Sequence, residues 1–430
     1  MQVETVAAPA PARRFTWGME LDAGQRAALR DVLTALLVSR LLIWVVGVAV
    51  ALAFTPDAVR LAHVDPAGWT SPFDSAALNA LVAPGARFDS AWLLEVANHG
   101  YEAPGTPAFF PLYPALTAAG GWLFGSDVLA GLLLSALASV GAIYLLHRLV
   151  ALDFGTDIAR RTVWIVACLP TSFTLTALYT EALFLLLSVG AIYAVRLGRW
   201  QLAAVAGALA ATTRSAGVLL ALPLLILYLW GPRADRPPDR IPGGLVPSYR
   251  LRPGVLAAAA PLLGVLGFVA FMVISRGEPL AMLDAQQLWE RSFEPLTAIP
   301  PALVAAGTGL VDLVAGTHLF AHSPNPRGMG AVNLFLLGAF ALSAWLAVRS
   351  IRLLPPAYTA YAFASLALPL TSPALEQPLM SIARFAMVAF PLWITAALLL
   401  DGERWRRALA VSLTLLAVST ALFAGWAVAP

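Results

Sequence analysis

Polar side chains are concentrated between residues 87 and 101, in the stretch RFDSAWLLEVANHGY, within a chain dominated by Ala, Leu and Val. Asp89 stands there between Phe88 and Trp92. A positioned carboxylate can act as a general base that takes a proton from a hydroxyl group. The alternative role is structural, because Asp89 or Ser90 at the start of a helix would cap free backbone N–H groups. The residues alone leave both roles open.

Two arginines stand at the ends of apolar runs, Arg214 in AATTRSAGVLL and Arg384 in SIARFAMVAFP. Ionisable groups at membrane depth cost about 2.5–3.5 kcal/mol each on insertion scales, which makes them functional candidates. The planar guanidinium group suits phosphate recognition, so these arginines are candidates for binding a lipid phosphate. Their alternative role is that of interfacial anchors that extend toward the headgroups.

Motifs for nucleotides and metals are missing from the sequence. It contains no G-x-x-x-x-G-K-[ST] loop, no G-x-G-x-x-G motif after a strand pattern, no CxxC motif and no Asp-x-Asp pair. His99 precedes Gly100, a pairing typical of a helix C-terminus, and no second histidine lies at ligand spacing. We therefore predict no cofactor, and neither ATP nor a soluble sugar nucleotide as substrate. No spacing indicates a metal site, and a divalent metal stays open as an alternative.

The composition indicates a membrane protein. Of 430 residues, 60% are hydrophobic and 12% are charged, about half the charged fraction of soluble domains. A crossing needs about 20 apolar residues. About eleven such runs occur, near 33–54, 128–147, 162–178, 181–196, 200–216, 217–231, 254–275, 331–348, 355–371, 385–400 and 408–427. The stretches 108–124 and 296–316 are ambiguous because prolines interrupt them.

The distribution of arginine orients these spans, because cytoplasmic loops carry an excess of basic residues. If neither ambiguous stretch crosses, 19 arginines lie inside and seven outside. Residues 1–30 and the loop 232–253 are then cytoplasmic, while the loops 55–127 and 276–330 are external. We expect one all-α transmembrane domain over 1–430, whose long first external loop contains short helices. The charged residues expected at the external face are Asp89, Glu181, Arg214, Glu290, Arg291 and Arg384.

Five ordered motifs resemble the PIG-V-like mannosyltransferases of the GT-C superfamily, multi-pass enzymes that use a polyprenyl-phosphate sugar as donor. The motifs are RFDSAWLLEVANHGY, AFFPLYP, LPTSFTLTALYTEALFLLLSVGAIYAVRLGRW, GALAATTRSAGVLL and SIARFAMVAFPLW, spread over about residues 87–400. Two positions depart from the family pattern, since Phe88 replaces a usual Trp and Ala216 replaces a polar amide. The identity of the sugar is the property that these changes put in question.

The resemblance implies a GT-C fold and an external aspartate, here Asp89, as catalytic base. It also implies a set of residues that bind donor phosphate or substrate: Arg384, Arg214, Glu181, Arg87, His99 and Tyr101. The expected partners are a polyprenyl-phosphate-linked sugar, an acceptor glycan, glycolipid or protein, and the lipid bilayer, with no nucleic acid. All 27 basic residues are arginines, which points to a GC-rich coding sequence and so to a bacterial protein. The expected location is therefore the bacterial plasma membrane, with the active site on its extracytoplasmic side.

A transport protein and a structural scaffold are the two alternatives to an enzyme. A transporter or flippase of a lipid-linked sugar predicts internal repeats and broken helices that meet at the membrane midplane, and the two halves of this sequence show no convincing repeat. A purely structural scaffold leaves the polar group at 87–101 unexplained. The sequence therefore favours an enzyme, with the transporter as the alternative.

Overall fold

The computed structural model describes residues 22–54, 58–240, 246–295, 297–316 and 330–428. Over these residues the chain is helical, and its only strand-like feature is an isolated bridge between Arg291 and Ala374. The predicted all-α class is thus confirmed. The first part of the predicted cytoplasmic tail, residues 1–21, and the end of the second external loop, 317–329, lie outside the described residues.

Within the described part of the chain, five helical segments are long and apolar enough to cross a membrane: α1 (Ala23–Ala53), α6 (Asp127–Phe154), Pro253–Arg276, which contains α11 (Leu256–Arg276), α14 (Gly330–Leu353) and α18 (Gly402–Ala424). A sixth arises if α16 (Ile382–Val388) and α17 (Phe390–Leu399), which meet at 74°, count as one span. Pro391 lies at the start of α17, and a proline cannot continue the preceding hydrogen-bond ladder. The predicted count of about eleven crossings stays a prediction.

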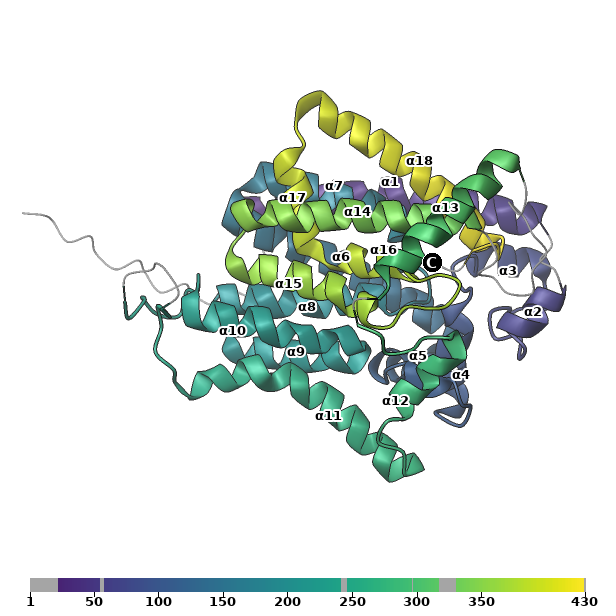
Figure 1. Cartoon of the computed structure of the whole chain (residues 1–430), viewed down its shortest axis with the longest axis horizontal. Coiled ribbons are helices and arrows are strands. Elements are labelled where there is room, and N and C mark those ends of the chain that lie inside the picture. Colours follow the sequence, from purple (N-terminus) through teal and green to yellow (C-terminus); the bar gives the residue numbers. More distant parts are fainter. Residues whose placement is uncertain (1–21, 55–57, 241–245, 296, 317–329, 429–430) are drawn as a thin grey trace, which may run out of the picture.

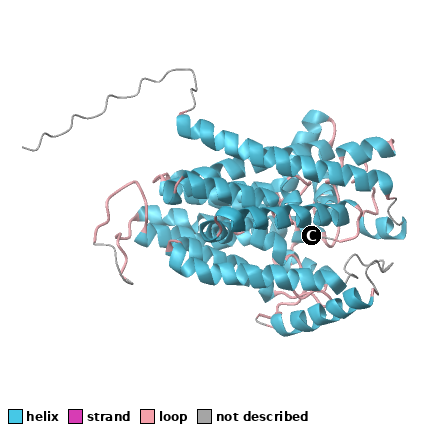
Figure 2. Cartoon of the chain, turned by 90° about the horizontal axis from the view of Figure 1, so that it is seen from above, coloured by secondary structure: helices cyan, strands magenta, loops and turns pink. Residues whose placement is uncertain are grey.

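The other predicted spans are shorter helices that are packed beside these segments. They are α7 (Thr156–Cys168), α8 (Glu181–Arg196), α9 (Trp200–Thr213), α10 (Ala221–Trp230) with the 3₁₀ segment η3 (Ser215–Leu220), and α15 (Pro356–Ala367) with η6 (Leu368–Thr371). Helix α6 packs against α7 and α8, and α9 packs against α8 and α11. Most of these helices run side by side along the long axis of the molecule (Figures 1 and 2).

Close helix contacts in this bundle depend on small residues. A Cβ atom at Gly264 of α11 would lie 2.3 Å from the backbone oxygen of Ala208 in α9, so only glycine permits this approach. Small residues at such contacts let helix backbones pack closely, which is how helices associate inside a membrane. The outward faces carry large exposed apolar side chains, such as Trp44 of α1 and Ile274 of α11, as expected where lipid replaces water.

Short helices form one end of the bundle. They are α2 (Ala58–Val64), α3 (Ala76–Val82), α4 (Asp89–His99), η1 (Thr106–Ala108) and α5 (Leu112–Phe124) from the first long loop, and α12 (Ala281–Asp284), η5 (Ala285–Trp289) and α13 (Ile299–Ala315) from the second. The predicted short helices in the first loop are therefore present. The ambiguous stretches 108–124 and 296–316 form α5, of 13 residues, and α13, of 17. At about 1.5 Å per residue, each helix is shorter than a hydrocarbon core of about 30 Å.

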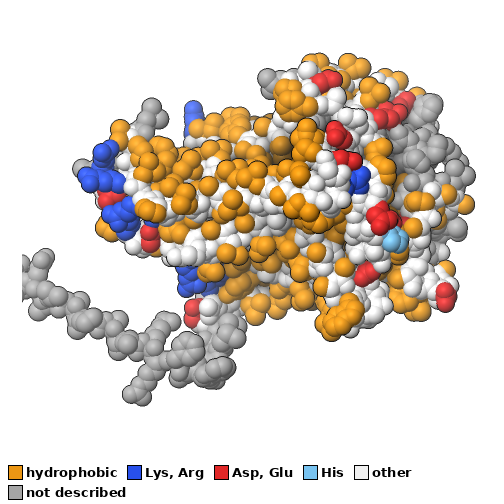
Figure 3. Space-filling view, turned by 90° about the horizontal axis from the view of Figure 1, so that it is seen from below, with side chains coloured by type: hydrophobic (Ala, Val, Ile, Leu, Met, Phe, Trp, Pro, Cys, Tyr) orange, Lys and Arg blue, Asp and Glu red, His pale blue; other side chains and the backbone are white. Residues whose placement is uncertain are grey.

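Charge separates along the same axis. Arginine side chains gather at the end of the molecule opposite the short helices, acidic side chains gather near the short helices, and apolar side chains cover the surface between them (Figure 3). This distribution is typical of a membrane protein with one basic face. Which face is external stays a prediction.

Candidate active site

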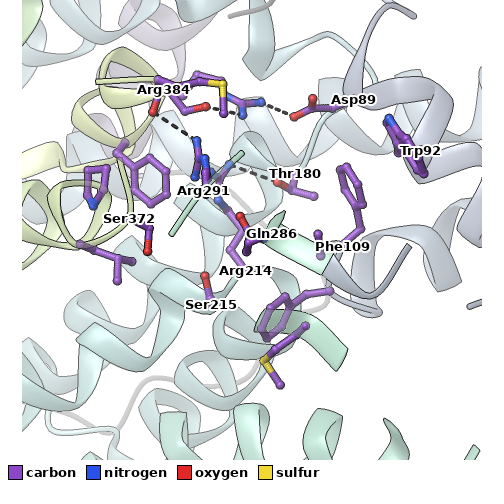
Figure 4. A pocket seen from close by; sticks show the side chains of 18 of the residues that line it. Asp89, Trp92, Phe109, Thr180, Arg214, Ser215, Gln286, Arg291, Ser372 and Arg384 are labelled. Carbon is purple, nitrogen blue, oxygen red and sulfur yellow. Dashed lines mark hydrogen bonds and ion pairs between the residues drawn. The ribbon is translucent and has the colours of Figure 1, made fainter. Parts of the chain in front are cut away.

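A pocket of about 640 Å³ lies where the two long loops meet the ends of the bundle helices. Its wall combines apolar and polar side chains from α4, η1, the turn before α8, the break after α9, the segment 282–293 and the segment 368–385. The labelled residues in Figure 4 are Asp89, Trp92, Phe109, Thr180, Arg214, Ser215, Gln286, Arg291, Ser372 and Arg384.

Asp89 is the first residue of α4, and its carboxylate faces Arg384 across the pocket (Figure 4). The N-cap position belongs instead to Phe88, which has a φ of 51° and makes no side-chain capping bond. The Oγ atom of Ser90 accepts from Arg87 N and donates to Leu178 O, at 3.0 Å each. The capping alternative for Asp89 and Ser90 is therefore wrong, because neither side chain serves the end of α4.

Arg384 links the carboxylates of the pocket. Its Nη1 atom donates to Asp89 Oδ2 at 2.5 Å and lies 3.6 Å from Glu181 Oε1, while Nη2 donates to Ser381 Oγ at 3.0 Å. The guanidinium carbon is 5.5 Å from the centre of the Tyr179 ring, within the range of a cation–π contact. Ser381 has a φ of 66°, so the turn before α16 directs Arg384 toward Asp89.

Glu181 and Arg214 form a second ion pair beside the first. Glu181 begins α8, is fully buried, and accepts a bond from Arg214 Nη1, which also donates to Thr180 Oγ1 at 3.2 Å. Arg214 lies at the break between α9 and η3. The break is fixed by Gly217, because a Cβ atom there would lie 2.4 Å from the Ala211 backbone.

The four charged groups form one connected network in which two carboxylates balance two guanidinium groups. Both carboxylates stand at the first residue of a helix, where the macrodipole favours negative charge. The Asp89 side chain is 29% exposed, against 0% for Glu181, so Asp89 is the carboxylate that a bound molecule can reach. Among the described residues, no three His, Cys, Asp or Glu side chains converge as metal ligands do.

Three residues of the first motif, Arg87, His99 and Tyr101, do not line this pocket. The buried Arg87 guanidinium donates to the carbonyl oxygens of Ala83, Ala86 and Ala424, and burial lowers its pKa to about 10, so it stays protonated at neutral pH. The geometry gives Arg87 a structural place between the first loop and α18.

His99 and Tyr101 likewise make contacts away from the pocket. His99 ends α4, with Gly100 after it at a φ of 70°, as the sequence predicts, and its Nδ1 lies 3.1 Å from Glu95 Oε1. Tyr101 donates its hydroxyl to Phe109 O at 2.9 Å, and burial raises its pKa above the ordinary value.

Some residues of the pocket were not singled out by the sequence. Tyr179 is buried, its hydroxyl accepts from Asp89 N at 3.3 Å, and its ring faces Arg384. Gln286 lines the opposite wall. Tyr179 stands next to Thr180 and Glu181 in the motif ALYTEA, so its place beside Glu181 could have marked it as a pocket residue. Gln286 lies in the short 3₁₀ helix η5 of the second long loop, which was not predicted from the sequence.

Comparison with known proteins identifies a family over part of the chain. Residues 29–227 match the model of the family described as mannosyltransferase (PIG-V), which confirms the resemblance drawn from the motifs over that segment. The match contains Asp89, Glu181 and Arg214, whereas Arg384 lies beyond it. No curated protein sequence matches the chain.

Two solved structures align with the chain, both of the oligosaccharyltransferase of Archaeoglobus fulgidus. One is tethered by a disulfide bond to an acceptor peptide containing the NVT sequon, with 15% identity and a TM-score of 0.39; the other is in complex with zinc and sulfate, with 14% identity and a TM-score of 0.34. The alignments cover 90% of this chain and 56% and 53% of the two others. The chain thus spans about half the length of these neighbours.

Proposed function

We propose that the chain is a GT-C-type membrane glycosyltransferase that transfers a sugar, mannose as the first candidate, from a polyprenyl-phosphate donor to an acceptor hydroxyl. The single observation that carries this proposal is the contact between Asp89 and Arg384 in a pocket formed by the long loops. A carboxylate that accepts a proton and guanidinium groups that hold a phosphate are the two functions such a transfer needs. The match to the mannosyltransferase family supports the same reaction class.

In the proposed mechanism, Asp89 takes the proton of the acceptor hydroxyl as the oxygen attacks the anomeric carbon of the donor. The bond between this carbon and the phosphate oxygen breaks, and its electron pair leaves with the polyprenyl phosphate. One displacement inverts the configuration of the anomeric carbon. A phosphate leaving group needs little protonation, so one carboxylate suffices.

Arg384 has two successive partners in this mechanism. Before transfer it pairs with the ionised Asp89, at 2.5 Å. Once Asp89 is protonated, the negative charge of the site has moved to the departing phosphate, which gains one charge as it leaves. Arg384 and Arg214 then stabilise the phosphate dianion, while Glu181 holds both guanidinium groups in place. Arginine suits this task because its donors are fixed in one plane.

The place of the pocket supports a transferase over a transporter. A transporter binds its substrate near the membrane midplane, whereas this pocket includes α4, η1 and the segment 282–293 from the two long loops. We propose that both loops lie outside a bacterial plasma membrane and that the whole of 1–430 is one enzyme domain. The acceptor would then be an external glycan, glycolipid or protein.

The direct test is to incubate membranes containing the protein with labelled polyprenyl-phosphate mannose and to identify the labelled product. We expect label on an acceptor other than the donor lipid, and no such product from membranes without the protein. Movement of the intact labelled lipid between leaflets of reconstituted vesicles, with no transfer, would instead favour the flippase.

The proposed orientation predicts the labelling of two introduced cysteines. Cys168 is buried and would first be replaced by alanine. Arg240→Cys and Ala67→Cys, both at exposed positions, should then react with an impermeant thiol reagent from opposite sides of the membrane, because 232–253 belongs to the arginine-rich face. Labelling of both cysteines from the same side would contradict the orientation.

A further inference from the structure

The segment 281–294, here called the strap, is the part of the second long loop that runs along the pocket, from the first long loop to the segment before α16. Its beginning packs onto the first loop, since Ala281 is buried in a cluster with Phe110, Phe268 and Met272. Its end pairs with the segment before α16, where Arg291 forms an isolated antiparallel bridge with Ala374 and Glu294 N donates to Thr371 O at 2.9 Å. The strap is therefore held at both ends.

The strap contributes Arg291 to the pocket wall. Glu290 before it has a φ of 53°, a left-handed conformation that turns the chain at this point. The Arg291 side chain lies on the same side of the pocket as those of Arg384 and Arg214 in the view of Figure 4, and its Nη2 donates to Met380 O at 3.3 Å. A third guanidinium group, on a different element, thus faces the same space as the Asp89 carboxylate.

The balance of charges in the site explains why a third guanidinium group is needed there. Arg384 and Arg214 are balanced by Asp89 and Glu181 before any substrate is present. A sugar linked to a polyprenyl chain through a phosphodiester brings one further negative charge. Placing that charge in a low-dielectric pocket without an additional positive group is costly. If Arg384 moved to meet the phosphodiester, Asp89 would lose the partner that holds its carboxylate in place.

We propose that Arg291 binds the phosphodiester of the donor before transfer. This assignment rests on the proposed function, and it divides the work among the arginines. Arg291 holds the single charge of the intact donor, and Arg384 responds to the second charge that appears on the phosphate when Asp89 takes the proton. Arg291 is a binding residue, so its loss should act on donor affinity, whereas the loss of Arg384 should act on the transfer step.

The test measures binding of a polyprenyl methyl phosphodiester, which carries one negative charge and no sugar to transfer, and of the uncharged polyprenol of the same chain length to purified protein. Arg291→Ala should bind the phosphodiester about ten- to a hundredfold more weakly, the loss expected for one charge-assisted bond, and polyprenol as before. Arg291→Lys should recover part of the affinity. Arg276→Ala is the matched control, because Arg276 bonds Tyr101 O and Glu278 outside the pocket, and it should bind both lipids normally.

The remaining outcomes separate this inference from the proposed function. If Arg291→Ala binds the polyprenyl phosphodiester as tightly as the unaltered protein does, the assignment of Arg291 is overturned while the transferase proposal stands. If the unaltered protein fails to distinguish the phosphodiester from polyprenol, the donor class is wrong and the assignment falls with it. Loss of phosphate affinity in Arg291→Ala, together with a raised donor KM and a near-normal kcat, supports the inference.

Discussion

Asp89→Asn should lower sugar transfer by at least about 10²- to 10⁴-fold, the contribution expected from a positioned general base. Asparagine has the size of aspartate and can still accept a bond from Arg384, but its amide does not take a proton at neutral pH. Donor binding should persist, because the substitution removes a negative charge from the pocket. The measurement is transfer of labelled sugar by the purified variant, with the melting temperature in detergent as a check on folding.

Glu95→Gln is the matched control for this substitution. Glu95 lies on the same helix and loses the same charge, but its carboxylate bonds Trp69 Nε1 at 2.8 Å and His99 Nδ1 at 3.1 Å rather than facing the pocket. We expect it to retain near-normal transfer. Retained turnover in Asp89→Asn would refute the assignment of the base, and Asp74 and Glu95 in the same loop would be the next carboxylates to examine.

Arg384→Ala should reduce kcat/KM for the donor by about ten- to a hundredfold, which corresponds to the roughly 1.5–3 kcal/mol of a charge-assisted bond. The effect should appear mainly in kcat, because the departing phosphate loses its cation and Asp89 loses its partner. Glu181 keeps its bond to Arg214, so the variant should still fold, as a melting measurement would verify.

Arg384→Lys separates charge from geometry at the same position. Lysine restores the positive charge, but it lacks the fork that lets Arg384 reach Asp89 and Ser381 together. We therefore expect activity between those of the alanine variant and the unaltered protein. Near-normal activity in both variants would return Arg384 to the role of an interfacial anchor.

The helices could be anticipated from sequence more readily than their lengths. Apolar runs located the bundle, because burial in lipid requires continuous apolar stretches whatever the tertiary contacts. The runs 200–216 and 217–231 appeared as two adjacent crossings. The structure has a helix for each run, α9 and the combined helix Ser215–Trp230, but the break between them falls at Arg214 rather than after residue 216. The break depends on Gly217 meeting the Ala211 backbone, a contact that no pattern of hydropathy contains.

The candidate site was anticipated in part, for a similar reason. The arginine distribution placed Asp89 and Arg384 at one face, but their 2.5 Å contact joins positions 295 residues apart, which only the folded bundle fixes. Residues close to Asp89 in the sequence were predicted less well, because Arg87, His99 and Tyr101 do not line the pocket. Asp89 and Trp92, about one turn apart on α4, line the pocket, whereas His99 lies two turns beyond Trp92 on the same face and contacts Trp69 instead. The place of Gln286 in the pocket wall depends on the contacts that hold the two ends of the strap, and the sequence does not show these contacts.

The left-handed backbone of Phe88 is maintained by distant residues, and this has a consequence for the timing of synthesis. The Phe88 ring packs 5.8 Å from that of Phe423 and 5.0 Å from that of Trp426, and Arg87 donates to Ala424 O across 337 residues of chain. The residues directly before Asp89 therefore lack their final supports until α18 has been translated and inserted. We expect a nascent chain whose first loop has already emerged to stay inactive until α18 follows. A ribosome that stalls before residue 423 would leave in the membrane a chain without the contacts of Phe88 and Arg87 to α18.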